Sequence, residues 1–219
     1  ALLTTVKEAV DNSLDACEEA GILPDVVVKI EVVPNGDGSL PPTPAQAERF
    51  TVTVADNGPG IVKKNISKVF AKLLYGSKFH RLRMSRGQQG IGISAAGMYG
   101  QLTTGKPTRV ISKTRTDDRA HVFEVSIDTK RNEPVEHETK QVEWDREQGT
   151  SVSIELAGKY QKGKTSVDEY LELTSVANPH VQLTYISPDS EKKVFPRGVD
   201  YLPDQPREIK PHPYGIELG

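Results

Sequence analysis

The stretch KEAVDNSLDA, residues 7–16, carries a carboxylate, an amide and a second carboxylate at helical spacing. Glu8, Asn12 and Asp15 stand at positions i, i+4 and i+7, so a helix would place them within roughly 60° of one another on its surface. An amide oxygen is a suitable Mg²⁺ ligand, and a glutamate one turn earlier could polarise a water for attack on a phosphate. The alternative is a solvated helix face, on which Asp11 either orients the glutamate or is simply hydrated.

A second candidate group follows a predicted strand. Residues 49–56, RFTVTVAD, alternate apolar and polar residues as a half-buried strand does, and Asp56 stands at their end, before the turn NGPG. A carboxylate that faces a cavity can accept a hydrogen bond from an exocyclic amine such as that of adenine. The glycines of the turn permit close backbone approach to a ligand. A surface turn begun by an aspartate explains these residues equally well when they are taken alone.

The stretch GQQGIG, residues 87–92, precedes a helical pattern and could wrap phosphates. Glycine permits positive φ angles that aim successive N–H groups at one anion, and a helix start adds the positive end of its dipole. The spacing G-x-x-G-x-G after a loop argues against a Rossmann turn, which requires G-x-G-x-x-G after a strand. The nearby GQLTTGKPT, residues 100–108, approaches a P-loop, but Pro107 stands where the Mg²⁺-binding hydroxyl would be.

The loop before these glycines is basic, with Lys78, His80, Arg81, Arg83 and Arg86. Such a loop suits a lid over a polyphosphate, and solvated charges or a DNA-contacting patch are the alternatives. His80 has no second histidine or cysteine nearby in the sequence, so a metal site is not predicted there.

The elements that position these groups mix helices with strands. We expect helices over 3–19, 65–74, 91–99 and 166–178, and strands over 26–33, 49–56, 108–115, 120–127, 140–145, 149–156, 181–187 and 192–196. In the first helix an apolar stripe of Leu3, Val6, Val10 and Leu14 lies roughly opposite the polar column. A doubly wound parallel fold would need helices between the strands of 108–156, and none is predicted there. We therefore expect an α+β fold, a two-layer sandwich whose mixed, mostly antiparallel sheet carries helices on one face.

Composition limits the function classes. The 219 residues are 36% hydrophobic and 26% charged, which is typical of a globular protein, and no apolar run approaches the roughly 20 residues that span a bilayer. The net charge of -2 provides no overall basic field for nucleic acid, so contacts with DNA would need a local patch or other parts of the protein. The single cysteine, Cys17, excludes an internal disulfide and suits a reducing cytosol. We expect the natural chain to be longer at both ends, because the first residues already have a helical pattern and the last, PHPYGIELG, form no closing element.

Together the three motifs resemble a known superfamily. E-x-x-x-N-x-x-D-A, D-x-G-x-G and G-x-x-G-x-G, in this order, are similar to the N, G1 and G2 boxes of the GHKL ATPases of the Bergerat fold. That superfamily holds gyrase-type topoisomerases, the ninety-kilodalton heat-shock chaperone, histidine kinases and MutL-type repair proteins. TTVKEAVDNSLDACEEAGILP, VFAKLLYGSKFH and RGQQGIGISAAGMYGQ look closer still to the B subunits of type IIB topoisomerases, the topoisomerase VI group of archaea and some eukaryotes.

The resemblance also divides the chain. Residues 1–200 correspond to the GHKL ATPase domain without its N-terminal strap. Residues 201–219 correspond to a linker, in which PHPYGIELG is similar to the lead-in to a helix-two-turn-helix domain.

The resemblance implies a role for each motif. Glu8 would be the general base for ATP hydrolysis, Asn12 the Mg²⁺ ligand and Asp56 the acceptor of the adenine amine, with Gly60 beside the nucleotide. Thr150, in GTSVSIEL, resembles the family's threonine whose hydroxyl reaches adenine through a water, although an ordinary strand threonine is an equal alternative. Asp15 would lie behind the ligands or near the ribose. The residues implied in phosphate contact are Ser77, Lys78, Gly87, Gln88, Gln89, Gly90, Ile91, Gly92, Ile93 and Ser94.

The resemblance further implies an ATP-operated gate that drives DNA strand passage. Its cofactors would be ATP and Mg²⁺. Its partners would be a topoisomerase VI A subunit, in an A2B2 heterotetramer, and double-stranded DNA, with homodimerisation on ATP binding. The location would be the cytoplasm in an archaeon and the nucleus in a eukaryote. The family also uses a lysine from a following transducer domain, so we expect this chain to bind ATP, hydrolyse it slowly and stay largely monomeric.

Three other functions stay open. One is another ATP-driven clamp of the chaperone or mismatch-repair type, and a second is a regulatory module that binds nucleotide without hydrolysis. Histidine phosphotransfer would require an acceptor-histidine helix upstream of these residues.

Overall fold

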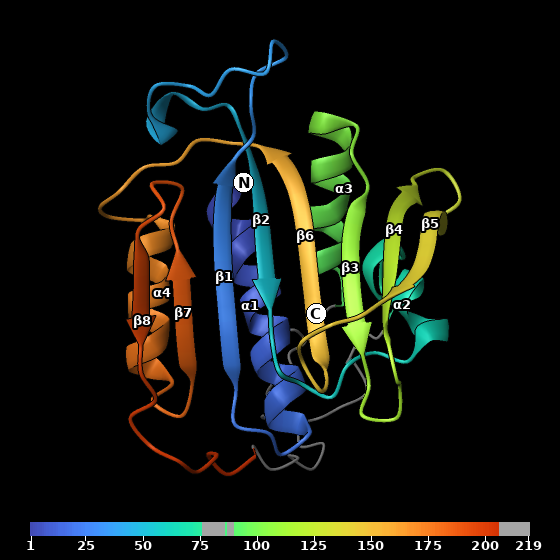
Figure 1. Cartoon of the computed structure of the whole chain (residues 1–219), viewed down its shortest axis with the longest axis vertical. Coiled ribbons are helices and arrows are strands. Elements are labelled where there is room, and N and C mark those ends of the chain that lie inside the picture. Colours follow the sequence, from blue (N-terminus) through green and yellow to red (C-terminus); the bar gives the residue numbers. More distant parts are fainter. Residues whose placement is uncertain (76–85, 87–89, 206–219) are drawn as a thin grey trace, which may run out of the picture.

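The computed structural model describes residues 1–75, 86 and 90–205, which form one layer of helices against one sheet (Figure 1). The helices are α1 (Leu2–Glu19), α2 (Lys63–Ala71), α3 (Gly92–Thr104) and α4 (Val167–Ala177), with a short 3-10 helix at Pro44–Gln46. The strands are β1 (Asp25–Val32), β2 (Arg49–Ala55), β3 (Thr108–Lys113), β4 (Ala120–Asp128), β5 (Glu133–Val142), β6 (Gly149–Ala157), β7 (Gln182–Ile186) and β8 (Lys192–Phe195).

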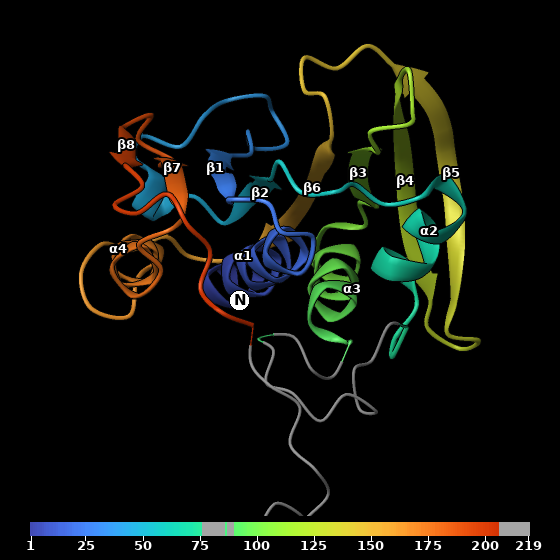
Figure 2. The ribbon, with the colours of Figure 1, turned by 90° about the horizontal axis from the view of Figure 1, so that it is seen from below.

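The sheet is mixed and mostly antiparallel, as predicted. Its strand order is β5-β4-β3-β6-β2-β1-β7-β8, and β1 runs parallel to β7 while the other neighbouring pairs are antiparallel. All four helices lie on the same side of this sheet (Figure 2). The two-layer α+β sandwich with helices on one face is therefore confirmed.

The core lies between α1, α3 and the covered face of the sheet. On β2 the predicted inward positions Phe50 and Val54 are buried, and on α1 Val6 and Val10 face them from the other layer. Leu3, at the start of the predicted stripe, is only partly buried against this core. Each fully buried apolar side chain of this size contributes about 1.5–3 kcal/mol to folding, so the stripe holds α1 on the sheet and leaves its polar column free for other contacts.

Helix α1 ends where a glycine permits the left-handed conformation. Gly21 has φ +70° and donates its N–H to the carbonyl of Glu18, and Ile22 donates to that of Cys17. This pair of bonds is a Schellman motif, which satisfies carbonyls that the helix end leaves free. The Cys17 side chain is buried, and its thiol donates to Asn57 Oδ1 at 3.6 Å.

Three predicted boundaries were wrong, each for a physical reason. The helix expected at 91–99 continues to Thr104, because Gly100 packs against β6 rather than ending the helix: a Cβ there would lie 2.6 Å from the carbonyl oxygen of Glu155. The strand expected at 140–145 occupies Glu133–Val142; this edge strand is largely exposed and so carries no apolar alternation. The second helix occupies Lys63–Ala71 rather than 65–74, since the chain leaves the helical conformation at Lys72.

The near-P-loop sequence is part of a helix and not a phosphate-binding loop. It runs through the last turns of α3, and Gly105, in the left-handed conformation, ends that helix. Within the described parts of the chain, no helix is both long and apolar enough to cross a bilayer.

Candidate functional site

One cavity of about 1200 Å³ collects the predicted site residues. It lies between α1, the turn after β2, the first turn of α3 and the start of β6. The predicted residues that line it are Glu8, Asn12, Asp56, Gly60, Gly90, Ile91, Gly92, Ile93 and Thr150. Three distant pieces of chain therefore meet at a single site.

Asp56 is buried in the wall of this cavity and held by three donors. Its Oδ2 accepts a hydrogen bond from Ser13 Oγ at 2.9 Å, and its Oδ1 accepts from the backbone N–H groups of Gly58 at 2.9 Å and Thr150 at 3.1 Å. Burial raises the pKa of Asp56, and these three hydrogen bonds oppose that rise. The carboxyl is therefore fixed in orientation at a largely apolar wall, as an acceptor for a ligand donor requires.

The turn after Asp56 depends on glycine. Gly60 has φ +72°, and a Cβ there would lie 2.1 Å from the carbonyl oxygen of Lys113. The next residue, Ile61, donates its N–H to Ser112 Oγ at 2.8 Å. The turn is thus fastened to β3, and the surface-turn alternative is wrong because both Asp56 and Gly60 line the cavity.

Ser112 is a site-supporting residue that the sequence analysis missed. Its hydroxyl is fully buried, lies 3.0 Å from Thr150 Oγ1 and donates to the carbonyl of Gly149 at 3.2 Å. A serine on the covered face of a strand is the only sequence signal, and it becomes meaningful only when β3 and β6 pair. Thr150 itself lines the cavity, but its hydroxyl already bonds to Ser112, so its role toward a ligand stays a prediction.

Glu8 and Asn12 project into the cavity from successive turns of α1. Neither side chain makes a hydrogen bond with any residue that the structure describes, and Asn12 is exposed. An amide and a carboxylate without partners among these residues, one turn apart in a cavity, are available to a ligand, a metal ion or a water.

The first turn of α3 faces this polar column closely. A Cβ on Gly92 would lie 1.8 Å from Glu8 Oε2, so the glutamate occupies the space that a side chain would need. Gly90 has φ +66°, as predicted for a glycine that turns the chain into a helix. The N-terminal N–H groups of α3 and the positive end of its dipole thus lie next to the cavity.

Ser94 differs from its neighbours. Its side chain is buried and donates to the carbonyl of Ile91 at 3.1 Å, and it is not among the residues that line the cavity. A role of the Ser94 hydroxyl in phosphate contact stays a prediction, whereas Gly90, Ile91, Gly92 and Ile93 of this turn do line the cavity.

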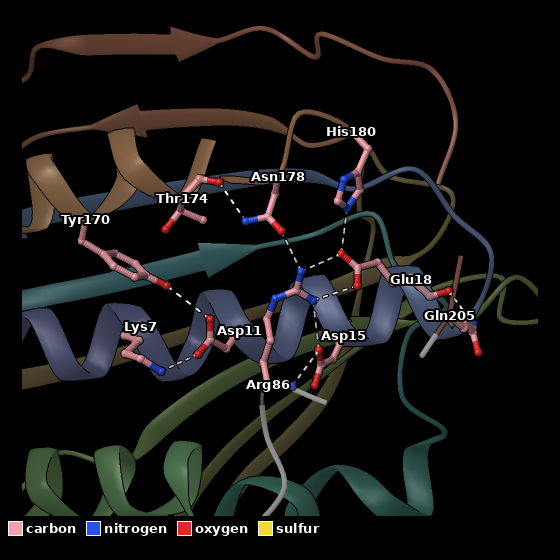
Figure 3. A network of polar contacts seen from close by, with 10 residues as sticks. All are labelled: Lys7, Asp11, Asp15, Glu18, Arg86, Tyr170, Thr174, Asn178, His180 and Gln205. Carbon is pink, nitrogen blue, oxygen red and sulfur yellow. Dashed lines mark hydrogen bonds and ion pairs between the residues drawn. The ribbon is translucent and has the colours of Figure 1, made fainter. Parts of the chain in front are cut away.

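The remaining acidic residues of α1 have protein partners (Figure 3). Asp11 pairs with Lys7 at 2.6 Å and accepts a hydrogen bond from Tyr170 at 3.3 Å, so it neither orients Glu8 nor stands alone in solvent. Asp15 lines the cavity and accepts from Arg86 at 3.1 Å. Arg86 is thus bound to α1 rather than solvated.

Several predicted residues lie outside the described residues. These are Ser77, Lys78, His80, Arg81, Arg83, Gly87, Gln88 and Gln89.

Asn12 is the residue of the cavity that could hold a magnesium ion. In the described residues, no three His, Cys, Asp or Glu side chains gather as a metal cluster would require. Mg²⁺ keeps several waters and needs few protein ligands, and the amide of Asn12 in a cavity suits it.

Comparisons with known proteins agree with this geometry. Residues 2–157 match the sequence profile of the family described as histidine kinase-, DNA gyrase B- and HSP90-like ATPase. The whole chain is 54% identical over 220 residues to a protein from Archaeoglobus fulgidus that is named as the B subunit of type 2 DNA topoisomerase 6, and it is 54% identical to its namesake in Methanococcoides burtonii. The chain spans about a third of the length of these relatives, 34% and 33%.

Solved structures share the fold at low sequence identity. The Aquifex aeolicus MutL ATPase domain complexed with ADP matches with a TM-score of 0.53 at 18% identity, covering 89% of this chain and 63% of that one. The ATPase region of Saccharomyces cerevisiae topoisomerase II bound to ICRF-187 matches with a TM-score of 0.54 at 11% identity, covering 87% of this chain and 48% of that one.

Proposed function

The chain belongs to the family of histidine kinase-, DNA gyrase B- and HSP90-like ATPases, and from this premise we propose that its cavity binds ATP with Mg²⁺ and hydrolyses the terminal phosphate. The observation that carries the proposal is the convergence of Asp56, the Glu8–Asn12 pair and the first turn of α3 on one cavity.

Asp56 supplies base recognition. Its carboxyl accepts a hydrogen bond from the exocyclic amine of adenine, whereas guanine presents a carbonyl oxygen at that position and would leave two acceptors facing each other. The fixed orientation given by Ser13 and Thr150 keeps this acceptor in place.

The triphosphate lies between Asn12 and the start of α3. Backbone N–H groups from Gly90 onward and the α3 dipole favour the negative charge. Asn12 would hold Mg²⁺, which when bound neutralises phosphate charge. Glu8 orients a water and takes its proton as the oxygen attacks the γ-phosphorus; the bond to the bridging oxygen breaks, and ADP and inorganic phosphate are the products.

For the whole protein we propose the B subunit of a type IIB DNA topoisomerase, with residues 1–200 as its ATPase domain and 201–219 as a linker. The relatives named as the B subunit of type 2 DNA topoisomerase 6 support this assignment. ATP binding would bring two B subunits together, and A subunits in an A2B2 assembly would cut the DNA duplex through which another passes, in the cytoplasm of an archaeon.

Isothermal titration calorimetry with the Mg²⁺ complex of a non-hydrolysable ATP analogue tests the binding step. The unsubstituted chain binds the analogue and prefers it to the guanine equivalent. Asp56→Asn loses that preference and most of the affinity, since an Asn amide presents a donor as well as an acceptor. Asn12→Ala loses the dependence on Mg²⁺. Absence of binding by the unsubstituted chain would refute the proposal.

Single-turnover hydrolysis of γ-labelled ATP tests the catalytic step. Glu8→Gln keeps the nucleotide affinity and loses hydrolysis, by about 10²–10⁴-fold for a general base. Hydrolysis by Glu8→Gln at the unsubstituted rate would exclude Glu8 as that base. For the longer protein, ATP-dependent relaxation of supercoiled DNA with a candidate A subunit separates a topoisomerase from a repair or chaperone clamp.

A further inference from the structure

We propose that Arg86 is the counter-charge of the nucleotide cavity: fastened to α1 by Asp15 and Glu18, it offsets the carboxylates of the cavity wall and so allows a triphosphate to bind. The inference rests on the proposed function and adds a residue that governs affinity for phosphate groups without touching them.

The described part of the cavity wall holds more acidic than basic side chains. Among the described residues that line it, the acidic side chains are Glu8, Asp15, Glu19 and Asp56, and the one basic side chain is Arg86. Four carboxyl groups around a polyanion disfavour its entry, because like charges repel most strongly where water is partly excluded. Among these described residues, the guanidinium of Arg86 supplies the positive charge.

Arg86 is held in a fixed place by several bonds (Figure 3). Its Nη1 donates to Asp15 Oδ1 at 3.1 Å and to Glu18 Oε2 at 2.8 Å, and its Nη2 donates to Glu18 Oε1 at 3.0 Å. The fork on Glu18 is bidentate, the geometry that guanidinium and carboxylate groups favour. Its Nη2 also donates to Asn178 Oδ1 at 2.7 Å.

The partners of Arg86 are themselves held. Glu18 Oε1 lies 2.7 Å from His180 Nε2, and Asn178 Nδ2 donates to the carbonyl of Thr174 at the end of α4 at 2.8 Å. The positive charge thus has a defined position at the cavity wall, set by α1 on one side and the end of α4 on the other. Both Nη groups of Arg86 are used by Asp15, Glu18 and Asn178, so this guanidinium acts on a nucleotide chiefly through its charge.

The consequence is specific to charged ligands. Loss of the Arg86 guanidinium makes the net charge of the cavity wall one unit more negative, and this holds whichever other groups Asp15 and Glu18 contact. Binding of a triphosphate weakens, while binding of adenosine, which has the same base and no phosphate, does not change. Asp15→Asn in the same chain removes one negative unit and restores the balance.

The test compares two ligands, the Mg²⁺ complex of a non-hydrolysable ATP analogue and adenosine, by calorimetry on the full chain. Arg86→Gln binds the analogue about tenfold more weakly, the order expected for one unit charge about 12 Å from another at an effective dielectric of about 20, and binds adenosine unchanged. Asp15→Asn combined with Arg86→Gln recovers most of the lost affinity. Arg86→Lys, which keeps the charge without the bidentate fork, stays close to the unsubstituted chain.

Arg109→Gln is the matched control, because it removes the same charge from an exposed position of β3 and is expected to change neither affinity. The inference is wrong if Arg86→Gln binds the analogue normally, if it loses both ligands alike, or if the double variant does not recover. The first result would show that the charge of Arg86 does not affect nucleotide affinity, and the other two would indicate that its role is purely structural. A chain that binds neither ligand before any substitution refutes the proposed function and this inference together.

Discussion

Gly92→Ala tests whether the close approach of α1 and α3 sets the position of Glu8, the general base that we propose. Gly92 is the first residue of α3, and its φ lies outside the left-handed region, so the backbone accepts alanine. The change adds one methyl group and no charge. Its nearest neighbours are the carboxylate and side-chain carbons of Glu8.

The magnitude follows from the geometry. The new Cβ would lie 1.8 Å from Glu8 Oε2 and 2.6 Å from Glu8 Cδ, whereas ordinary contact begins near 3.4 Å. The carboxylate must therefore move by about 1.6 Å, which a flexible side chain can do by changing rotamer. Misplacement of a catalytic group by about 1 Å can cost roughly 10²-fold in rate. The free energy of unfolding should change by less than about 1 kcal/mol, because alanine is at least as good a helix residue as glycine.

The assay is single-turnover hydrolysis of γ-labelled ATP, read beside calorimetric affinity and urea denaturation. We expect a rate about 100-fold lower with affinity retained, because the base and metal contacts assigned to Asp56 and Asn12 do not involve the new methyl group. In a Glu8→Gln background, Gly92→Ala should have no further effect on rate, since both act on one group. An unchanged rate, or a loss of affinity as large as the loss of rate, would refute the reasoning.

Three further predictions concern the support of the site. Gly60 and Gly105 share φ +72°, but only at Gly60 would a Cβ lie 2.1 Å from the carbonyl oxygen of Lys113. Gly105→Ala should therefore lower the free energy of unfolding, measured by urea denaturation, by about 1–2 kcal/mol because of its backbone conformation alone. Gly60→Ala should lower it clearly more. Equal costs would contradict the contact. Burial raises the pKa of the Cys17 thiol, so iodoacetamide should modify Cys17 only as the chain unfolds, and rapid labelling of the native protein would contradict this. Burial also raises the pKa of Asp56 above its unfolded value, so the stability that its protonated form contributes is present at low pH and is lost as pH rises through the folded pKa. The free energy of unfolding of Asp56→Asn, relative to that of the unsubstituted chain, should therefore increase from pH 4 to pH 7, about the span between the ordinary aspartate pKa and neutrality. A difference that does not depend on pH would show that the pKa is not raised.

Local patterns predicted the elements that bury one regular face. The apolar stripe of α1 and the alternation of β2 place their own side chains, so the polar column of Glu8 and Asn12 and the position of Asp56 at a strand end followed from spacing alone. The motifs also predicted that these groups and Gly90 belong to one site, because their order resembles that of a known superfamily. Where no face is regularly buried, as on the edge strand β5, the pattern failed.

The tertiary structure alone decided which partners hold the site together. Ser13 reaches Asp56 across 43 residues of sequence, Thr150 reaches it across 94, and Ser112 joins the site only because β3 pairs with β6. Arg86, which the sequence placed in a basic loop, is bound through its side chain to Asp15 and Glu18 of α1. Periodicity reports which face of an element is buried, whereas hydrogen bonds and ion pairs between distant elements depend on strand order and register, and these are set by packing of the whole chain.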